Sequence, residues 1–185
     1  SRTLGSMGEK GTRNNTKCKM ALVLARPNSG LHIICCCCFG SHQVNAKQRV
    51  GVLPEGLWLF DRLTGLQLIC YSGILRGMDL TIVTDRAHEL LGALGLADAG
   101  GTLVVDYSAG MTKKISLACA LIHAPRLLVL DEPFESVDPI SASTIRQILA
   151  GYAASAGPFI LSRHFMHLVP RPGARVAVVS CAASR

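Results

Sequence analysis

The 185-residue chain has few aromatic side chains, few charged ones and no long apolar run. Aromatic residues make up 5% of it and charged residues 17%. No stretch reaches the ~18 apolar residues that a membrane-spanning helix needs, so any span would come from another chain. The net charge of +7 is scattered, without a run of about five like charges or interleaved aromatic residues. This pattern argues against a nucleic-acid partner.

The eight cysteines are not spaced as a disulfide framework, and the first residues lack the apolar segment of a secretory signal. We therefore expect the cysteines to stay reduced. Cys35 to Cys38 are consecutive, with His32 and His42 nearby. Neighbouring side chains in a strand point to opposite faces, so four consecutive cysteines in one strand would not converge on a metal ion. We interpret them as small apolar strand residues.

Alternating strand and helix patterns predict the fold class. Continuously apolar runs predict buried strands at residues 33–39, 49–53, 127–130, 159–161 and 175–179. Apolar residues at helical spacing lie between the strands, and two helical stretches follow each other between about residues 62 and 96. Strands of this kind are typical of a parallel sheet covered on both faces. We therefore expect an α/β fold with a parallel sheet and an inserted helical lobe.

Two adjacent carboxylates, Asp131 and Glu132, follow the apolar run 127–130 and precede a proline. Consecutive residues at a strand end point in different directions, so one carboxylate can bind Mg²⁺ and the other can polarise a water molecule. A solvated acidic pair at the start of a turn would have the same sequence. These two residues alone do not decide between the alternatives.

Further motif segments surround this pair. Tyr107-Ser-Ala-Gly-Met111 precedes an amphipathic helix, where Ser108 is a good N-cap and small residues allow an anion to approach the helix N-terminus. Ser136-Val-Asp-Pro139 lies downstream. His164 follows a predicted strand, where it can contact a terminal phosphate, although a lone histidine is more often structural.

Together these segments resemble the motifs of ABC transporter ATP-binding subunits, in the branch that serves drug and sodium exporters. Residues 107–111 resemble the signature motif, Asp131 and Glu132 the Walker B pair, residues 136–139 the D-loop, and His164 the switch histidine. Residues 51–64 resemble the Q-loop region, with Glu55 in place of the glutamine. The resemblance covers nearly all of residues 49–180, and the order and spacing of the set are highly specific.

The resemblance implies a RecA-like P-loop NTPase core with a parallel sheet and an inserted helical lobe. We expect residues 1–185 to form one ABC ATPase domain, with a core lobe at 1–55 and 120–185 and a helical lobe at 56–119. The chain starts too late for the family's leading antiparallel strands and for the aromatic residue that stacks on adenine, so the domain is expected to be N-terminally truncated.

The phosphate-binding loop departs from the family pattern G-x-x-G-x-G-K-[ST]-[ST]. Residues 26–30 match a later family segment, and counting back without a gap places the loop on residues 8–16. There, Arg13 replaces a glycine, Asn14 the lysine and Asn15 the Mg²⁺-binding hydroxyl. A neutral amide cannot supply the charge of the lysine, and arginine is no substitute for it. Either the loop is eroded, or the segment is not a phosphate loop.

The resemblance also implies roles for individual residues, with ATP and Mg²⁺ as cofactors. The implied catalytic residues are Glu132, as general base, and His164, in contact with the γ-phosphate. The implied nucleotide-binding residues are Gly8, Gly11, Asn14, Asn15, Thr16, Glu55, Ser108, Gly110 and Asp138. Ser108 and Gly110 would act in trans on a partner's nucleotide. The implied Mg²⁺ ligands are Asp131, Asn15 and Glu55.

The implied partners are a multi-span membrane permease and a second ABC ATPase chain, in a homodimer or heterodimer, and no nucleic acid. The implied location is cytoplasmic, peripheral on the inner face of the cell membrane. One alternative is a catalytically impaired pseudo-ATPase that supplies its signature motif in trans to an intact paralogue. Soluble ABC ATPases of translation or DNA repair carry tandem cassettes or a long coiled-coil insert, and this sequence has neither.

Overall fold

A computed structural model of the chain describes residues 3–7, 33–34, 37–38, 48–54, 60–155, 157, 159–163 and 175–178. The chain divides into two compact units. The first comprises Ser1–Glu55, Arg126–Pro133 and Ala153–Arg185, and the second comprises Gly56–Pro125 and Phe134–Tyr152. This division groups residues 120–125 and 134–152 with the helices, so the core and helical lobes drawn from the sequence stay a prediction.

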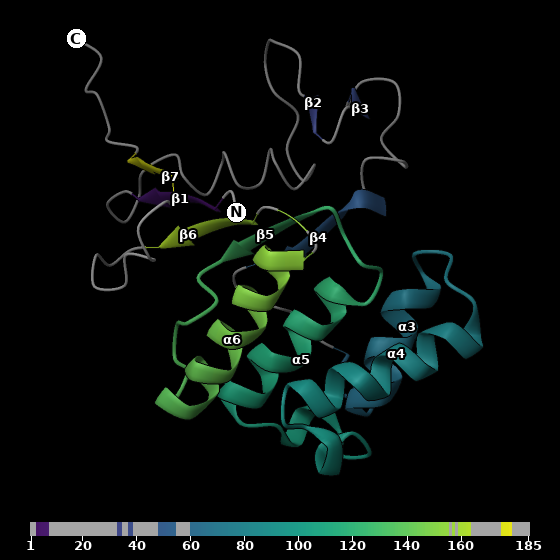
Figure 1. Ribbon diagram of the computed structural model, residues 1–185. Coiled ribbons are helices and arrows are strands. Elements are labelled where there is room, and N and C mark those ends of the chain that lie inside the picture. The colour runs from purple at the N-terminus through teal and green to yellow at the C-terminus, as the bar shows by residue number, and fades with distance from the viewer. Residues whose placement is uncertain are drawn as a thin grey trace, which may run out of the picture. The chain divides into compact units, whose positions relative to one another are not determined.

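The first unit contains a five-stranded parallel sheet in the order β4-β5-β6-β1-β7 (Figure 1). Its strands are listed here in chain order: β1 (Thr3–Met7), β4 (Val50–Leu53), β5 (Leu127–Asp131), β6 (Phe159–Arg163) and β7 (Arg175–Val178). The parallel sheet expected from the sequence is confirmed. The strand β1 was not predicted, because a glycine and a serine interrupt its short apolar pattern.

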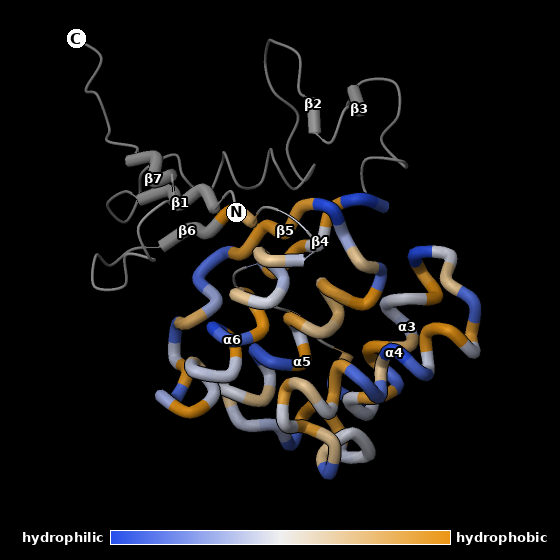
Figure 2. The backbone as a smooth tube through the Cα atoms, viewed as in Figure 1, coloured by the Kyte–Doolittle hydropathy of each residue, from blue (hydrophilic) through white to orange (hydrophobic). Residues whose placement is uncertain are grey.

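The strand β5, which lies between β4 and β6, is buried on both faces. Leu128, Val129 and Leu130 are all 0% exposed, although consecutive strand residues point to opposite faces. Val129 packs with Val50 of β4, and Ile160 of β6 lies against this pair. Figure 2 shows β5 as a hydrophobic stretch of the backbone. The continuous apolarity of residues 127–130 thus has the structural basis that the sequence predicted.

The prediction of a single strand over residues 33–39 is wrong. The structure forms two short strands there, β2 (Ile33–Ile34) and β3 (Cys37–Cys38), paired antiparallel in a separate two-stranded sheet. An apolar run predicts burial but does not specify where a chain reverses its direction. The argument against a metal ion at Cys35 to Cys38 assumed that these residues lie in one continuous strand. Because they do not, that argument no longer applies. Among the described residues, no group of His, Cys, Asp or Glu is arranged to bind a metal ion.

The second unit is helical, as expected for residues 62–96 and for the segments that follow the signature and D-loop matches. It contains α3 (Gly65–Ile74), α4 (Leu80–Ala93), two 3-10 turns, η1 (Ala97–Ala99) and η2 (Val104–Asp106), α5 (Ala109–Leu121) and most of α6 (Pro139–Ser155). Within the described ranges, no helix is long and apolar enough to cross a bilayer.

Local capping explains where these helices begin. Thr64 and Gln67 form a capping box at α3: the Thr64 N–H donates to Gln67 Oε1 at 3.0 Å, and the Gln67 N–H donates to Thr64 Oγ1 at 3.2 Å. Asp79 caps α4 by accepting from the Thr81 N–H at 2.9 Å. Each cap satisfies N–H groups that a helix terminus leaves unpaired, contributing about 1 kcal/mol.

The helices bury one apolar core in this unit. Ile69 of α3, Val83 of α4 and Ile115 of α5 are each 0% exposed. Burial also raises the pKa of the Cys119 thiol in α5 to about 11. This thiol therefore stays protonated at neutral pH.

Candidate functional site

The carboxyl ends of β5, β6 and β1 lie side by side at one edge of the parallel sheet. Asp131, the last residue of β5, pairs with Ser162 of β6, and Arg163 at the end of β6 pairs with Met7 at the end of β1. Each strand end leads directly into a predicted site residue: Glu132 follows Asp131, His164 follows Arg163, and Gly8 follows Met7. Ligands of open parallel sheets bind outside this edge.

The acidic pair at the end of β5 has an unusual backbone. Asp131 is 6% exposed, and Glu132 is half-buried with φ = +47°. A left-handed conformation costs a non-glycine residue about 1–2 kcal/mol. It turns the chain away from the strand directly after Asp131. Strained residues of this kind cluster at functional sites, and this geometry fits the separate roles expected for the pair.

The signature segment forms the N-terminus of α5. Ser108 is the N-cap, as predicted, and its Oγ accepts from the Met111 N–H at 3.3 Å. A serine hydroxyl has one proton and two lone pairs, so after accepting this bond Ser108 keeps its own proton to donate to an anion. Ser108 and Ala109 are exposed. The first N–H groups of α5 have no partner within the helix, which makes this end a favourable place for a phosphate.

Gly110 is fixed in position by the start of α6. A Cβ atom at position 110 would lie 2.5 Å from Asp138 Oδ2 and 2.6 Å from Ser141 Oγ, closer than side-chain carbons approach. Asp138 itself caps α6, accepting from the Ser141 N–H at 2.8 Å. This backbone bond, followed by the Ser141 hydroxyl, lowers the pKa of the Asp138 carboxyl. The structure thus brings together two predicted site residues, Gly110 and Asp138, from the signature and D-loop segments.

The remaining predicted site residues lie outside the described residues. They are Gly8, Gly11, Asn14, Asn15, Thr16, Glu55 and His164. Asp131 and Glu132 belong to the first unit, and Ser108, Gly110 and Asp138 to the second. The roles of all these residues in binding or catalysis stay predictions.

Sequence reasoning missed a close contact beside the signature segment, between Gly65 and the aromatic ring of Tyr107. Tyr107 is 9% exposed, and its hydroxyl donates to the Ala99 carbonyl at 2.7 Å. A Cβ at Gly65, the first residue of α3, would overlap that hydroxyl. The only available signal was a glycine at the first position of a predicted helix, where glycine is not a preferred residue.

Comparison with known families and proteins agrees with this arrangement. A model of the ABC transporter family matches residues 19–135. The match starts after the candidate phosphate loop at residues 8–16 and includes both the signature segment and the acidic pair.

Individual relatives extend the similarity over most of the chain. The chain is 31% identical over 180 residues to an uncharacterized ABC transporter ATP-binding protein of Nostoc sp., covering 96% of this chain and 53% of that protein. It is 27% identical over 177 residues to the linearmycin resistance ATP-binding protein LnrL of Bacillus subtilis, covering 96% of this chain and 57% of that protein. The chain therefore spans a little over half the length of these curated relatives.

A solved structure described as the ATP binding subunit of an ABC transporter shares the fold, with a TM-score of 0.80. It is 22% identical in sequence, and the alignment covers 88% of this chain and 68% of that structure. At this identity, the likeness shows the α/β fold with its parallel sheet.

Proposed function

Because the chain belongs to the ABC transporter family, we propose that it is an ATP-binding subunit that couples ATP-driven dimer closure to transport. The observation that carries this proposal is the edge of the sheet where Asp131 ends β5 beside the carboxyl ends of β6 and β1. At this edge lie Asp131, Arg163 and Met7, the residues that directly precede the predicted general base, switch histidine and phosphate loop.

The donor set at this edge fits Mg²⁺, which takes oxygen ligands, and the buried Asp131 carboxylate supplies such an oxygen. We propose that Asp131 binds Mg²⁺ together with Asn15 and Glu55. Bound Mg²⁺ would neutralise charge on the β- and γ-phosphates. Glu132 accepts a proton from the attacking water, and His164 orients toward the γ-phosphate. Gly8, Gly11, Asn14 and Thr16 contact the phosphates, and Glu55 also connects the site to the membrane partner.

The signature turn acts on the nucleotide of a second ATPase chain. Ser108 donates its remaining proton, and the N–H groups near Gly110 direct the positive end of α5 toward the γ-phosphate. Asp138 adds a D-loop contact near this site. When the two chains close on ATP, the permease is driven to its other state, and hydrolysis resets it.

A second candidate function follows from residues 13–15. Arg13, Asn14 and Asn15 depart from the loop pattern, whereas Ser108, Gly110 and the acidic pair keep theirs. A chain of this kind fits a pseudo-ATPase that completes a heterodimer and leaves hydrolysis to its paralogue. The two candidates differ in turnover at this chain's own loop but share nucleotide binding and the role of the signature.

Magnesium-dependent ATP binding tests the shared part of the proposal. Asp131→Asn removes a charged ligand, which is expected to weaken Mg²⁺-dependent ATP binding by about tenfold or more. Binding measured without Mg²⁺ should change little. Asp106→Asn, at an exposed position before the signature, is the control and should bind ATP as the unmodified chain does. Equal affinity for Asp131→Asn and the control would contradict the assignment.

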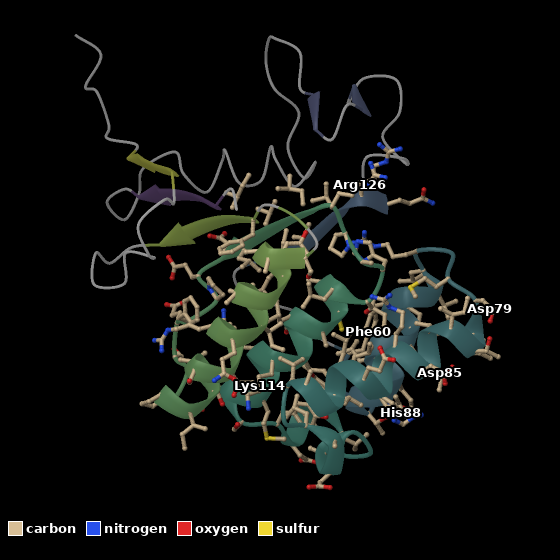
Figure 3. The ribbon with its side chains drawn as sticks, viewed as in Figure 1. Phe60, Asp79, Asp85, His88, Lys114 and Arg126 are labelled. Carbon is tan, nitrogen blue, oxygen red and sulfur yellow. The ribbon has the colours of Figure 1, made fainter. Side chains whose placement is uncertain are left out.

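The permease is proposed to dock at the apolar segment that starts at Leu57 and ends at Phe60. Phe60, labelled in Figure 3, is 56% exposed. Its ring contacts that of Tyr71 in α3 edge to face, with centroids 5.2 Å apart. Exposed apolar residues continue at the C-terminal end of α3, at Ile74 and at its C-cap Leu75. An apolar surface of this kind is typical of a protein interface, and it suits a peripheral subunit on the cytoplasmic face of the membrane.

Co-purification with the permease tests this interface. Trp58→Ala and Phe60→Ala are each expected to reduce recovery of the permease, because they remove the large apolar side chains of the segment. Ile140→Ala, at an 80% exposed position on α6, is a control outside the segment. Recovery that is the same for all three variants would count against docking at residues 57–60.

A further inference from the structure

A hydrogen-bonded ladder joins the segment after the Q-loop match to the segment before the signature turn. The Gly65 N–H donates to the Thr102 carbonyl at 3.2 Å, and the Val104 N–H donates to the Leu63 carbonyl at 2.9 Å. Thr64 and Leu103 form an antiparallel bridge between these bonds. Backbone bonds thus link residues 61–66 to residues 100–105 at several successive positions.

Tyr107 extends this ladder into the signature turn. Its hydroxyl donates to the Ala99 carbonyl at 2.7 Å, and its ring lies over Gly65, where a Cβ would be 3.1 Å from Cζ. Ser108, the next residue, caps α5. One buried side chain thus contacts the start of α3 and immediately precedes the residue proposed to donate to the partner's nucleotide.

We propose that Tyr107 is a positioning residue that ties the signature turn to residues 61–66, so that displacement of that segment moves Ser108. The proposal rests on the function assigned to Ser108 above. Residues 61–66 follow Phe60, the exposed end of the proposed permease-docking segment. A partner that moves Phe60 thereby moves the ladder, the Tyr107 ring and the cap of α5 as one packed body.

The position of Gly65 makes this arrangement specific. The Tyr107 hydroxyl occupies the space that any larger residue at position 65 would need, and the next nearest atoms are Tyr107 Cζ at 3.1 Å and Ile115 Cδ1 at 3.3 Å. Alanine at position 65 therefore has to displace the tyrosine. Removing only the hydroxyl relieves the worst overlap and leaves contacts that a small shift can accommodate.

Tyr152 supplies a matched control elsewhere in the same unit. Its hydroxyl also donates to a backbone carbonyl, that of Pro125, at 2.9 Å, and it is 7% exposed. Tyr107→Phe and Tyr152→Phe each remove one hydroxyl–carbonyl bond, partly buried at Tyr107 and buried at Tyr152, so they should lower global stability by similar amounts. Only Tyr107→Phe removes the hydroxyl bond that joins the residue before Ser108 to Ala99, the residue next to the ladder segment 100–105.

Native-state hydrogen exchange of the full chain tests whether Tyr107 positions the signature turn. In Tyr107→Phe, the amides of Val104 and Thr112 are expected to exchange about three- to tenfold faster than in Tyr152→Phe. Val104 reports the ladder, and Thr112, which donates to the Ser108 carbonyl at 2.8 Å, reports the first turn of α5. If the Thr112 amide exchanges equally fast in the two variants, Tyr107 does not position the turn and the proposal is overturned.

Rescue gives a second, independent measurement. Gly65→Ala is expected to accelerate Thr112 exchange by displacing Tyr107, and Gly65→Ala combined with Tyr107→Phe should exchange no faster than Tyr107→Phe alone. Additive effects of the two substitutions would overturn the proposed contact. Neither measurement needs nucleotide. If Ser108→Arg leaves a transporter fully active, the proposed function fails while the exchange results still decide whether Tyr107 positions the turn.

Discussion

Replacing Glu132 by glutamine is expected to abolish ATP turnover in a chain whose phosphate loop has been restored by Arg13→Gly, Asn14→Lys and Asn15→Thr. Glu132 directly follows the buried Mg²⁺-ligand candidate Asp131, at the carboxyl edge of the sheet. Glutamine has a similar size but cannot accept a proton from water. Loss of a general base costs about 10²–10⁴-fold in rate.

ATP binding should survive this substitution, because Asp131 and the restored loop are unchanged. Turnover and equilibrium ATP binding of the restored chain, with and without Glu132→Gln, separate the two effects. Glu135→Gln, at an exposed position three residues later, is the matched control and should keep full turnover. If Glu132→Gln hydrolyses ATP as fast as the restored chain, Glu132 is not the general base.

Ser108→Arg is expected to abolish turnover of a transporter in which this chain is paired with a paralogue that has an intact loop. In a head-to-tail dimer, the signature of one chain completes the site built on the other chain's loop. Ser108 is exposed and keeps a proton to donate, whereas arginine at this position removes the hydroxyl and places a long side chain at the end of α5. Loss of one preorganised donor costs about 10²–10³-fold in rate.

Glu132→Gln in the same heterodimer is the informative control. In the proposed dimer, Glu132 belongs to the site built on this chain's own loop, which we propose is eroded, so its loss should leave turnover of the competent site nearly unchanged. In this heterodimer, Ser108→Arg is therefore expected to abolish ATP turnover, whereas Glu132→Gln should leave it nearly unchanged. Full activity of Ser108→Arg, measured as ATP turnover of the assembled transporter, would rule out a role in trans for this signature.

The chemistry-bearing segments of the fold were predictable because their patterns are local. The apolar run 127–130 ends in two carboxylates, and burial on both faces explains its continuous apolarity. Ser108 before an amphipathic stretch predicted an N-cap, since serine satisfies the free N–H groups of a helix terminus. The motifs around these segments identified the family, and the family model confirms that resemblance.

The features that sequence reasoning missed depend on contacts between distant residues. The apolar run at residues 33–39 gives no information about a reversal, so β2 and β3 were read as one strand. The strand β1 is weakly apolar and is defined by its pairing with β6 and β7. The contacts of Gly65 with Tyr107, and of Gly110 with Asp138, join residues 42 and 28 positions apart, and no local pattern signals them.

The most direct test of the central claim compares ATP affinity and turnover of the chain as it stands with those of the triple reversion Arg13→Gly, Asn14→Lys, Asn15→Thr. Restoring the lysine regains a charge-assisted contact of roughly 1.5–3 kcal/mol, which is about one to two decades in affinity. We predict weak or undetectable turnover before reversion and tighter ATP binding after it. If the unmodified chain hydrolyses ATP at rates normal for an ABC ATPase, with no gain in affinity on reversion, the eroded-loop account is contradicted and the phosphate loop lies elsewhere in the chain.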